Sequence, residues 1–221
     1  DASVYIVTES VFSMDGDTPD LKALADYSGK SQYHLIVDEA HAVGVYGING
    51  GGIIPQLKLE EKIFARTVTF GKAFGCHGAA VIGSSDLKHY LVNFAKSLIY
   101  TTALTPHTLA TIITAHEYFA ESGKTEVELL TSNILHFKKE IKAQGLEKHF
   151  ISSESAIQSC IISGVGKAKT VAAKLKDKGF GVKAILSPTV PEGQERLRFC
   201  IHSYNSYEEL GLVVKLLSNY M

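Results

Sequence analysis

The chain has 221 residues, and its 22 lysine and arginine residues nearly balance 23 aspartate and glutamate residues, which gives a formal net charge of −1. This balance excludes a protein that is held to nucleic acid by bulk positive charge. Apolar residues make up 45% and charged residues 20% of the chain. This is ordinary globular usage, and it excludes a disordered or low-complexity protein.

The cysteine content and the length of the apolar runs limit the cellular compartments to be considered. No apolar run approaches the ~18 residues that a membrane-spanning helix needs, and no secretory signal pattern opens the chain. Cys76, Cys160 and Cys200 lie far apart without metal-type spacing, so we expect neither a disulfide framework nor a metal site. These observations predict a cytoplasmic protein that binds neither membrane nor nucleic acid.

The first half of the chain alternates strand-like and helical segments. The strand-like runs cover residues 3–8, 33–38, 63–70 and 79–83. Thr18 followed by Pro19 predicts the start of a helix, because the threonine can cap it and proline suits its first position. A second helical pattern covers residues 86–95. Strands that alternate with helices predict an α/β fold.

The pattern changes after Pro106, where apolar residues keep helical spacing over a long stretch that is broken around Gly123. We place a domain boundary there, which gives a first domain of residues 1–122 and a second of residues 123–221. The predicted elements of the second domain are strands at 158–163, 181–186 and 196–201, a helix at 167–178, and a final helix that opens with a capping box of Ser206 and Glu209. They indicate a small α+β domain.

Three polar clusters each follow a predicted strand, at residues 10–17 (SVFSMDGD), 38–47 (DEAHAVGVYG) and 69–75 (TFGKAFG). Each cluster alone is ordinary turn chemistry. In open α/β sheets, however, ligands bind outside the carboxyl ends of the strands. The three clusters together therefore predict one ligand site.

The string DEAH at residues 38–41 suggests, as a remote alternative, an ATPase in which two acids manage magnesium and water. Such an enzyme needs a Gly-x-x-x-x-Gly-Lys-Ser/Thr loop to hold phosphates. No such loop precedes Asp38, and the balanced charge offers no basic track for a nucleic acid strand.

Pyridoxal phosphate accounts for all three clusters. A carboxylate at a strand end, Asp38, can keep a pyridine nitrogen protonated, because an opposite charge favours the charged state. A lysine in a tight turn among apolar groups, Lys72, can form a Schiff base with an aldehyde when it is partly desolvated. The hydroxyls of Ser13 and Thr69 can serve the phosphate or the ring oxygen, and His41 can turn back onto the ring.

Five motifs carry a family resemblance. They are VTESVFSMDGD, VDEAHAVGVYG, TFGKAFG, SLIYTT and PTVPEGQERLR, in that order. In order and spacing they resemble the α-oxoamine synthases, a family of fold-type-I pyridoxal-phosphate enzymes. Members of that family are nearly twice as long as this chain. The resemblance therefore implies the C-terminal part of a large cofactor-binding domain, with a mostly parallel sheet and flanking helices, followed by a small α+β domain.

The resemblance also implies the roles of individual residues. Lys72 is the expected Schiff-base lysine, Asp38 the expected partner of the pyridine nitrogen, and His41 the expected hydrogen-bonding partner of the phenolic oxygen. Ser13 is expected beside that oxygen and Thr69 near the phosphate.

Two further sets of residues are implied. Thr101 and Thr102 match a segment that reaches the neighbouring subunit's phosphate site, which implies a homodimer. Arg198 is expected to clamp the amino-acid carboxylate as a bidentate fork, and the alternative for Arg198 is a surface salt bridge on a strand. Several family members carry a histidine where this chain has Asn205.

The implied reaction is the decarboxylative condensation of a small L-amino acid, with L-alanine favoured, and an acyl-CoA or acyl-carrier thioester to give an α-oxoamine. Three alternatives remain. One is a pyridoxal-phosphate aminotransferase of the same fold, which uses the same lysine and aspartate. Another is a family member of the 2-amino-3-ketobutyrate CoA ligase type. The third is a non-catalytic subunit, against which the presence of Asp38, His41 and Lys72 argues.

Overall fold

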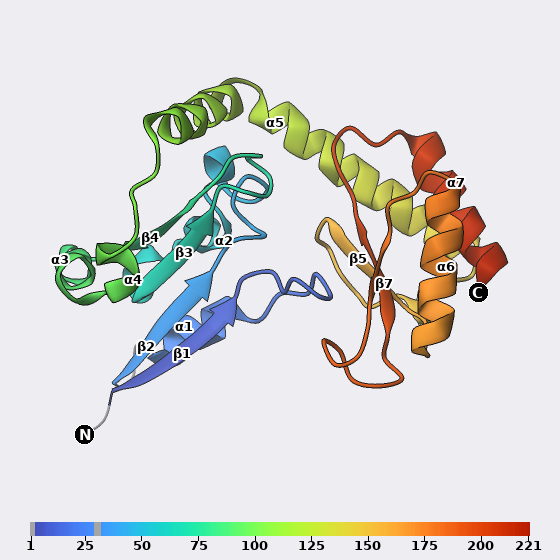
Figure 1. Cartoon of the computed structure of the whole chain (residues 1–221), viewed down its shortest axis with the longest axis horizontal. Helices are drawn as coiled ribbons and strands as arrows, with labels where there is room; N and C mark the ends of the chain where they lie inside the picture. Colours follow the sequence, from blue (N-terminus) through green and yellow to red (C-terminus); the bar gives the residue numbers. More distant parts are fainter. Residues whose placement is uncertain (1–2, 29–31) are drawn as a thin grey trace. The chain divides into compact units, whose positions relative to one another are not determined.

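The computed structural model describes residues 3–28 and 32–221. The chain forms two compact units (Figure 1). Unit 1 comprises Asp1–Val11 and Thr18–Lys124, and unit 2 comprises Phe12–Asp17 and Thr125–Met221.

Unit 1 is built on a four-stranded sheet. Its strands are β1 (Val4–Glu9), β2 (Tyr33–Asp38), β3 (Ala65–Thr69) and β4 (Ala79–Gly83), in the order β1-β2-β3-β4. β1 pairs with β2 and β2 with β3 in parallel, whereas β4 is antiparallel to β3. The predicted α/β fold with a mostly parallel sheet is confirmed.

Short helices connect and flank these strands. They are α1 (Leu21–Ser28), η1 (Ile48–Gly50), α2 (Ile53–Gln56), η2 (Glu60–Lys62), α3 (Ser85–Phe94) and α4 (Lys96–Ile99). Leu21 and Ala25 of α1 pack on Leu35 and Val37 of β2 and form the core of the unit. The expected helix start at Thr18 and Pro19 is wrong. Helix α1 begins at Leu21 because the Asp20 carboxylate, an equally good cap, accepts a 2.9 Å hydrogen bond from Ala23 N.

The long helix α5 (Pro106–Ala143) runs without a break through Gly123. The expected interruption there is wrong, although glycine costs a helix roughly 1 kcal/mol relative to alanine. Packing explains why glycine stands at this position. A Cβ on Gly123 would lie 2.6 Å from the ring of Phe119, so only glycine leaves room for that ring.

Unit 2 contains an antiparallel sheet of three strands, β5 (Ile157–Ile161), β6 (Lys183–Ile185) and β7 (Arg196–Cys200), in the order β5-β7-β6. Its other elements are η3 (Glu147–His149), α6 (Val165–Asp177), α7 (Tyr207–Tyr220) and the C-terminal part of α5. These helices and strands share one apolar core that includes Phe137, Leu175, Leu197, Val214 and Leu217.

The last helix confirms the predicted capping box. Ser206 Oγ accepts a 3.2 Å hydrogen bond from Glu209 N, and Glu209 Oε2 accepts a 3.0 Å bond from Ser206 N.

Candidate functional site

The candidate site of unit 1 lies at the carboxyl ends of its parallel strands. Asp38 ends β2, and its register partners are Glu9 on β1 and Thr67 on β3. Because side chains alternate along a strand, Asp38, Thr67 and Thr69 are on the same face of the sheet. The backbone of the three strand ends is also joined, since Ser10 N donates a 2.8 Å hydrogen bond to Asp38 O and Glu39 N donates a 2.8 Å hydrogen bond to Thr67 O.

The Asp38 carboxylate is oriented by the chain that follows it. Its Oδ1 accepts a 2.8 Å hydrogen bond from Ala40 N, and the residue is half-buried. This turn bends the chain away from the sheet and leads to His41, which is also half-buried. A half-buried carboxylate with a fixed orientation can hold a proton on a ligand's ring nitrogen more effectively than a mobile surface carboxylate.

The lysine lies in a tight turn between β3 and β4. Gly75 N donates to Lys72 O over 2.9 Å, and Cys76 N donates to Phe70 O over 2.7 Å. Gly75 has a φ of +62°, which favours glycine. Lys72 itself is exposed. The expected partial desolvation of Lys72 is therefore wrong for this chain, because the turn directs Phe74 rather than the lysine toward its neighbours.

The lysine turn touches the loop that carries Asp38 and His41. A Cβ on Gly44 would lie only 2.7 Å from the Cβ of Ala73, which is the residue after Lys72. Gly44 also has a φ of +81°. Glycine at this position thus permits the close approach of the two loops, and this contact brings two of the predicted clusters together.

Helix α5 braces the lysine turn from its other side. The ring of His116 stacks on Phe74, with ring centroids 4.3 Å apart and an interplanar angle of 14°. His116 also meets Phe70 edge-on at 5.7 Å, and Phe119 meets Phe74 edge-on at 5.5 Å. The sequence patterns did not predict this brace. The only signal for it was the pair of ring side chains three residues apart on one helix face.

A buried ion pair holds the glycine-rich loop after His41. Glu39 is fully buried, and its carboxylate accepts hydrogen bonds from Ile54 N (2.9 Å) and Arg66 Nε (2.6 Å). Arg66 Nη2 donates to Gly51 O over 2.7 Å. Through these bonds, the ion pair of Glu39 and Arg66 holds the far end of the loop between β2 and α2 against the sheet. Glu39 is thus engaged in a structural ion pair, so the DEAH string gives the ATPase alternative no support.

Thr69 supplies an observation that bears on a phosphate ligand. Its Oγ1 is buried, and no group among residues 3–28 and 32–221 forms a hydrogen bond with it. An unpaired buried hydroxyl is costly, and it suits an external acceptor such as a phosphate oxygen. A group that combines an aldehyde, a basic ring nitrogen and a phosphate therefore fits Lys72, Asp38 and Thr69. Thr101 and Thr102 lie elsewhere, exposed after α4.

Unit 2 brings together two other predicted residues, Ser13 and Arg198. Arg198 Nη1 donates a 2.8 Å hydrogen bond to Ser13 O. Arg198 Nε is buried and has no hydrogen-bond partner within the described part of the chain. None of the ion pairs in that part involves Arg198. Its side chain thus has a free buried donor that can meet a carboxylate oxygen.

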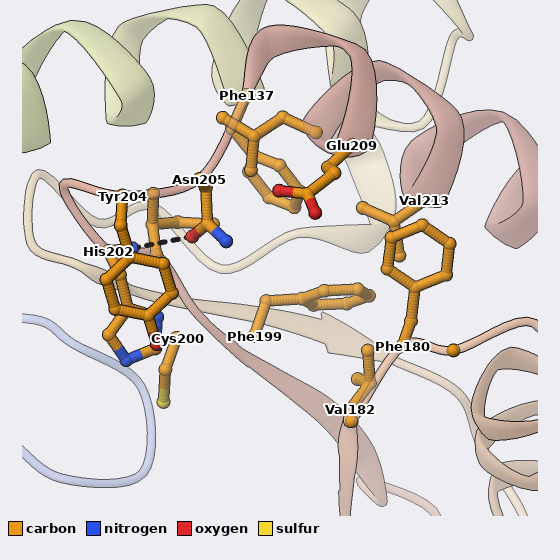
Figure 2. A pocket seen from close by; sticks show the side chains of 14 residues that line it. Phe137, Phe180, Val182, Phe199, Cys200, His202, Tyr204, Asn205, Glu209 and Val213 are labelled. Atoms are coloured by element: carbon orange, nitrogen blue, oxygen red, sulfur yellow. Dashed lines mark hydrogen bonds between the residues drawn. The ribbon is translucent and has the colours of Figure 1, made fainter.

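Unit 2 also contains a cavity of about 260 Å³ between β7 and α7 (Figure 2). Its floor is formed by the aromatic rings of Phe137, Phe180 and Phe199. At its rim, Asn205 Oδ1 accepts a 2.8 Å hydrogen bond from His202 N. The side chain of Asn205 therefore closes its own turn.

The mostly parallel sheet, with a carboxylate and a lysine turn at the carboxyl ends of its parallel strands, has the α/β fold of the fold-type-I transferases. The chain belongs to the aminotransferase class I and II family, whose profile matches residues 1–212. No helix in the described residues is long and apolar enough to cross a membrane.

Similarity to individual relatives narrows the assignment within this family. The chain is 37% identical to the 8-amino-7-oxononanoate synthase of Emericella nidulans and 37% identical to that of Pseudomonas entomophila, over 99% and 98% of this chain and 55% of each relative. It thus spans about half the length of these relatives. The motif resemblance, which within the α-oxoamine synthases favours this enzyme, is confirmed.

Solved structures agree with this assignment. The 8-amino-7-oxononanoate synthase of Francisella tularensis superposes with a TM-score of 0.85 at 32% identity, covering 98% of this chain and 62% of that one. Serine palmitoyltransferase from S. paucimobilis superposes with a TM-score of 0.88 at 26% identity, covering 98% and 54%, and that protein was solved with bound PLP.

Proposed function

We propose that the protein containing this chain is a pyridoxal-phosphate-dependent α-oxoamine synthase that condenses L-alanine with an acyl-CoA or acyl-carrier thioester. The observation that carries the proposal is the contact of Gly44 with Ala73, which brings the loop of Asp38 and His41 against the turn of Lys72. The relatives named 8-amino-7-oxononanoate synthase, at 37% identity, support this choice of reaction.

When bound, pyridoxal phosphate supplies an electron sink for the carbanion that forms at the amino-acid Cα. In this proposal Lys72 Nζ holds the cofactor covalently, and the Asp38 carboxylate holds a proton at the ring nitrogen. His41 donates a hydrogen bond to the phenolic oxygen, and Thr69 Oγ1 donates one to the phosphate. Arg198 binds the carboxylate of the amino acid through its fork of donors.

When it is not bonded to the cofactor, the Lys72 amine would act as general base and take the Cα proton. The Cα then attacks the thioester carbonyl, and the thiol leaves. Loss of CO₂ from the carboxylate and return of one proton to Cα complete the balance. Alanine and an acyl thioester thus give an α-oxoamine, CO₂ and a free thiol.

We further propose that residues 1–122 are the C-terminal part of a large cofactor-binding domain and that residues 123–221 are a small α+β domain. Units 1 and 2 differ from these domains in assigning Phe12–Asp17 to unit 2 and in a boundary two residues later. We also propose a cytoplasmic homodimer in which Thr101 and Thr102 reach the partner's phosphate site. Their exposure beside Tyr100, which is 83% exposed, supports this role.

The test of the reaction uses the full-length protein loaded with pyridoxal phosphate. L-alanine and an acyl-CoA are added, and free thiol and CO₂ are measured. We expect one thiol for each CO₂, with neither released when alanine is omitted. Transfer of the amino group to a 2-oxo acid without thiol release would show an aminotransferase instead. Thiol release with glycine or serine in preference to alanine would overturn the substrate assignment.

A further inference from the structure

The segment Phe12–Asp17, which we call the strap, leaves unit 1 and belongs to unit 2. It is a closed loop, because Phe12 N donates to Asp17 O over 2.9 Å and Gly16 N donates to Phe12 O over 2.8 Å. It carries Ser13, the residue expected beside the phenolic oxygen of the cofactor. What holds the strap therefore determines where the Ser13 hydroxyl lies.

Unit 2 holds four consecutive residues of the strap, each through a different side chain. The contacts are Arg198 Nη1 to Ser13 O (2.8 Å), Ser159 Oγ to Met14 O (2.7 Å), the ion pair of Arg196 with Asp15, and Ser153 Oγ to Gly16 O (2.9 Å). Three of these anchors are neutral backbone carbonyls, for which water is a ready substitute. The fourth is a pair of opposite charges.

The Asp15–Arg196 pair is the least replaceable anchor. Arg196 is buried, with 4% of its side chain exposed, and its Nε donates a 3.0 Å hydrogen bond to Gln194 O. The backbone thus fixes the direction of the guanidinium. A buried guanidinium that loses its carboxylate is left uncompensated, so any displacement of Asp15 is opposed.

Two features fix the register of the strap. A Cβ on Gly16 would lie 2.4 Å from Ile157 O, so only glycine fits against the backbone of β5. Arg196 and Arg198 are alternate residues of β7 and point to the same face of the sheet. The arginine that anchors Asp15 therefore lies beside the arginine that binds Ser13 O.

We propose that Asp15 and Arg196 are positioning residues that hold Ser13 in register with Arg198. This inference rests on the proposed function, because it assigns the Ser13 hydroxyl to the cofactor. We do not expect Arg196 to touch either the substrate or the cofactor. It acts through Asp15 on the strap, so that the cofactor contact of Ser13 and the carboxylate contact of Arg198 share one rigid support.

The test is a double-mutant cycle on the full-length protein, with pyridoxal phosphate affinity and the pH titration of its absorbance as readouts. Ser13→Ala and Asp15→Asn should each weaken binding of the cofactor by about 3- to 10-fold, as expected for one hydrogen bond. The double variant should lose no more affinity for the cofactor than the single variant with the larger loss, because Asp15 acts through Ser13. A purely structural role of Asp15 would give additive losses.

The matched control is Glu154→Gln, which removes an exposed ion pair with Lys138 in the same unit. It should leave cofactor affinity unchanged. Arg196→Lys serves as a second variant should Asp15→Asn not fold. It should weaken cofactor binding and change the pH titration of the cofactor absorbance in the same way as Ser13→Ala, because an ammonium cannot donate to Asp15 and to Gln194 O as the guanidinium does.

Additive losses, an unchanged affinity in Asp15→Asn, or an unchanged affinity in Ser13→Ala would each overturn the positioning role. The proposed function is checked separately, by borohydride reduction of the wild-type holoprotein and peptide mapping. Cofactor trapped on Lys72 together with an additive cycle would overturn only the inference about the strap. No cofactor on Lys72 would overturn the proposed function and this inference with it.

Discussion

Asp38 and Glu39 are adjacent acids with different surroundings. Asp38 is half-buried at the end of β2 and is oriented by Ala40 N. Glu39 points to the opposite face of the sheet and is neutralised by Arg66. A carboxylate that already has a guanidinium partner is poorly suited to a ligand, whereas Asp38 keeps an oxygen for one.

This difference predicts opposite outcomes for two isosteric changes. Asp38→Asn should keep pyridoxal phosphate on Lys72 but lower turnover at least 100-fold, because a neutral amide cannot hold the ring nitrogen protonated. Glu39→Gln should instead lower the melting temperature, since it leaves Arg66 buried without its charge partner. Turnover and thermal unfolding of both variants provide the comparison. Near-normal turnover in Asp38→Asn would show that Asp38 only caps the end of the strand.

Cys160 and Cys200 are expected to differ in reactivity because they differ in burial, which the sequence alone does not reveal. Burial raises the pKa of the Cys160 thiol to about 12, whereas Cys200 is exposed. At pH 8, iodoacetamide should therefore modify Cys200 in the native chain and spare Cys160, because the thiolate is the nucleophile. Both should react in denaturant. Mass spectrometry of the peptides decides this, and early labelling of Cys160 in the native chain would contradict the burial of its thiol.

At the scale of elements, the contact between the lysine turn and the loop after β2 is the critical one. Gly44→Ala would place a Cβ 2.7 Å from that of Ala73, at a φ of +81°. We expect weaker pyridoxal phosphate binding and a lower melting temperature, with a destabilisation of about 1–2 kcal/mol from the positive φ alone and more from the clash.

Gly145→Ala is the matched control for this change. Gly145 has a φ of +67°, but a Cβ there meets nothing within 4 Å. It should therefore show the cost of the backbone conformation alone and leave cofactor affinity unchanged. Equal stability losses and equal affinities in the two variants would show that the contact with Ala73 does not position the lysine turn.

The Glu195 carboxylate contributes to the acid stability of unit 2. Glu195 Oε2 accepts a 2.8 Å hydrogen bond from Gly164 N at the start of α6, and this bond holds the pKa of Glu195 below its usual range. Such a group stabilises the folded state above its ordinary pKa of about 4.3, and the stabilisation is lost as the pH falls through the lowered pKa. Glu195→Gln should flatten this part of the stability curve, which urea unfolding between pH 3 and about pH 6 measures. If the free energy of unfolding falls with pH in Glu195→Gln as it does in the wild type, this hydrogen bond contributes nothing to stability in acid.

The elements themselves were largely predictable. Tyr33–Asp38 and Ala79–Gly83 are strands with the predicted bounds because each contains a pair of β-branched residues, which favour strands. The continuity of α5 was not predictable, since Gly123 ordinarily indicates a break and only the ring of Phe119 explains it. The brace by His116 and the ion pair of Glu39 with Arg66 escaped for a different reason. They join residues that lie far apart in sequence, and periodicity reports only local neighbours.

At the scale of the whole molecule, the proposed homodimer makes a prediction that distinguishes shared from separate sites. Thr101 and Thr102 are exposed, so their hydroxyls are available to a partner. If they complete the partner's phosphate site, Lys72 and the two threonines of one site come from different subunits. A defect in Lys72 and a defect in the threonines should then complement each other.

Lys72→Ala protein and the double variant Thr101→Val/Thr102→Val are mixed in equal amounts and allowed to exchange subunits. In each mixed dimer one site receives both defects and the other receives none. Random exchange makes half of the dimers mixed, so about a quarter of the wild-type activity should appear. The unmixed Lys72→Ala protein should be inactive, and the threonine variant should require more pyridoxal phosphate for activity. No recovery on mixing would show that the threonines serve their own subunit, because each mixed dimer would then contain one site without Lys72 and one site without the threonines. Full activity of the unmixed threonine variant would show that the threonines serve no site.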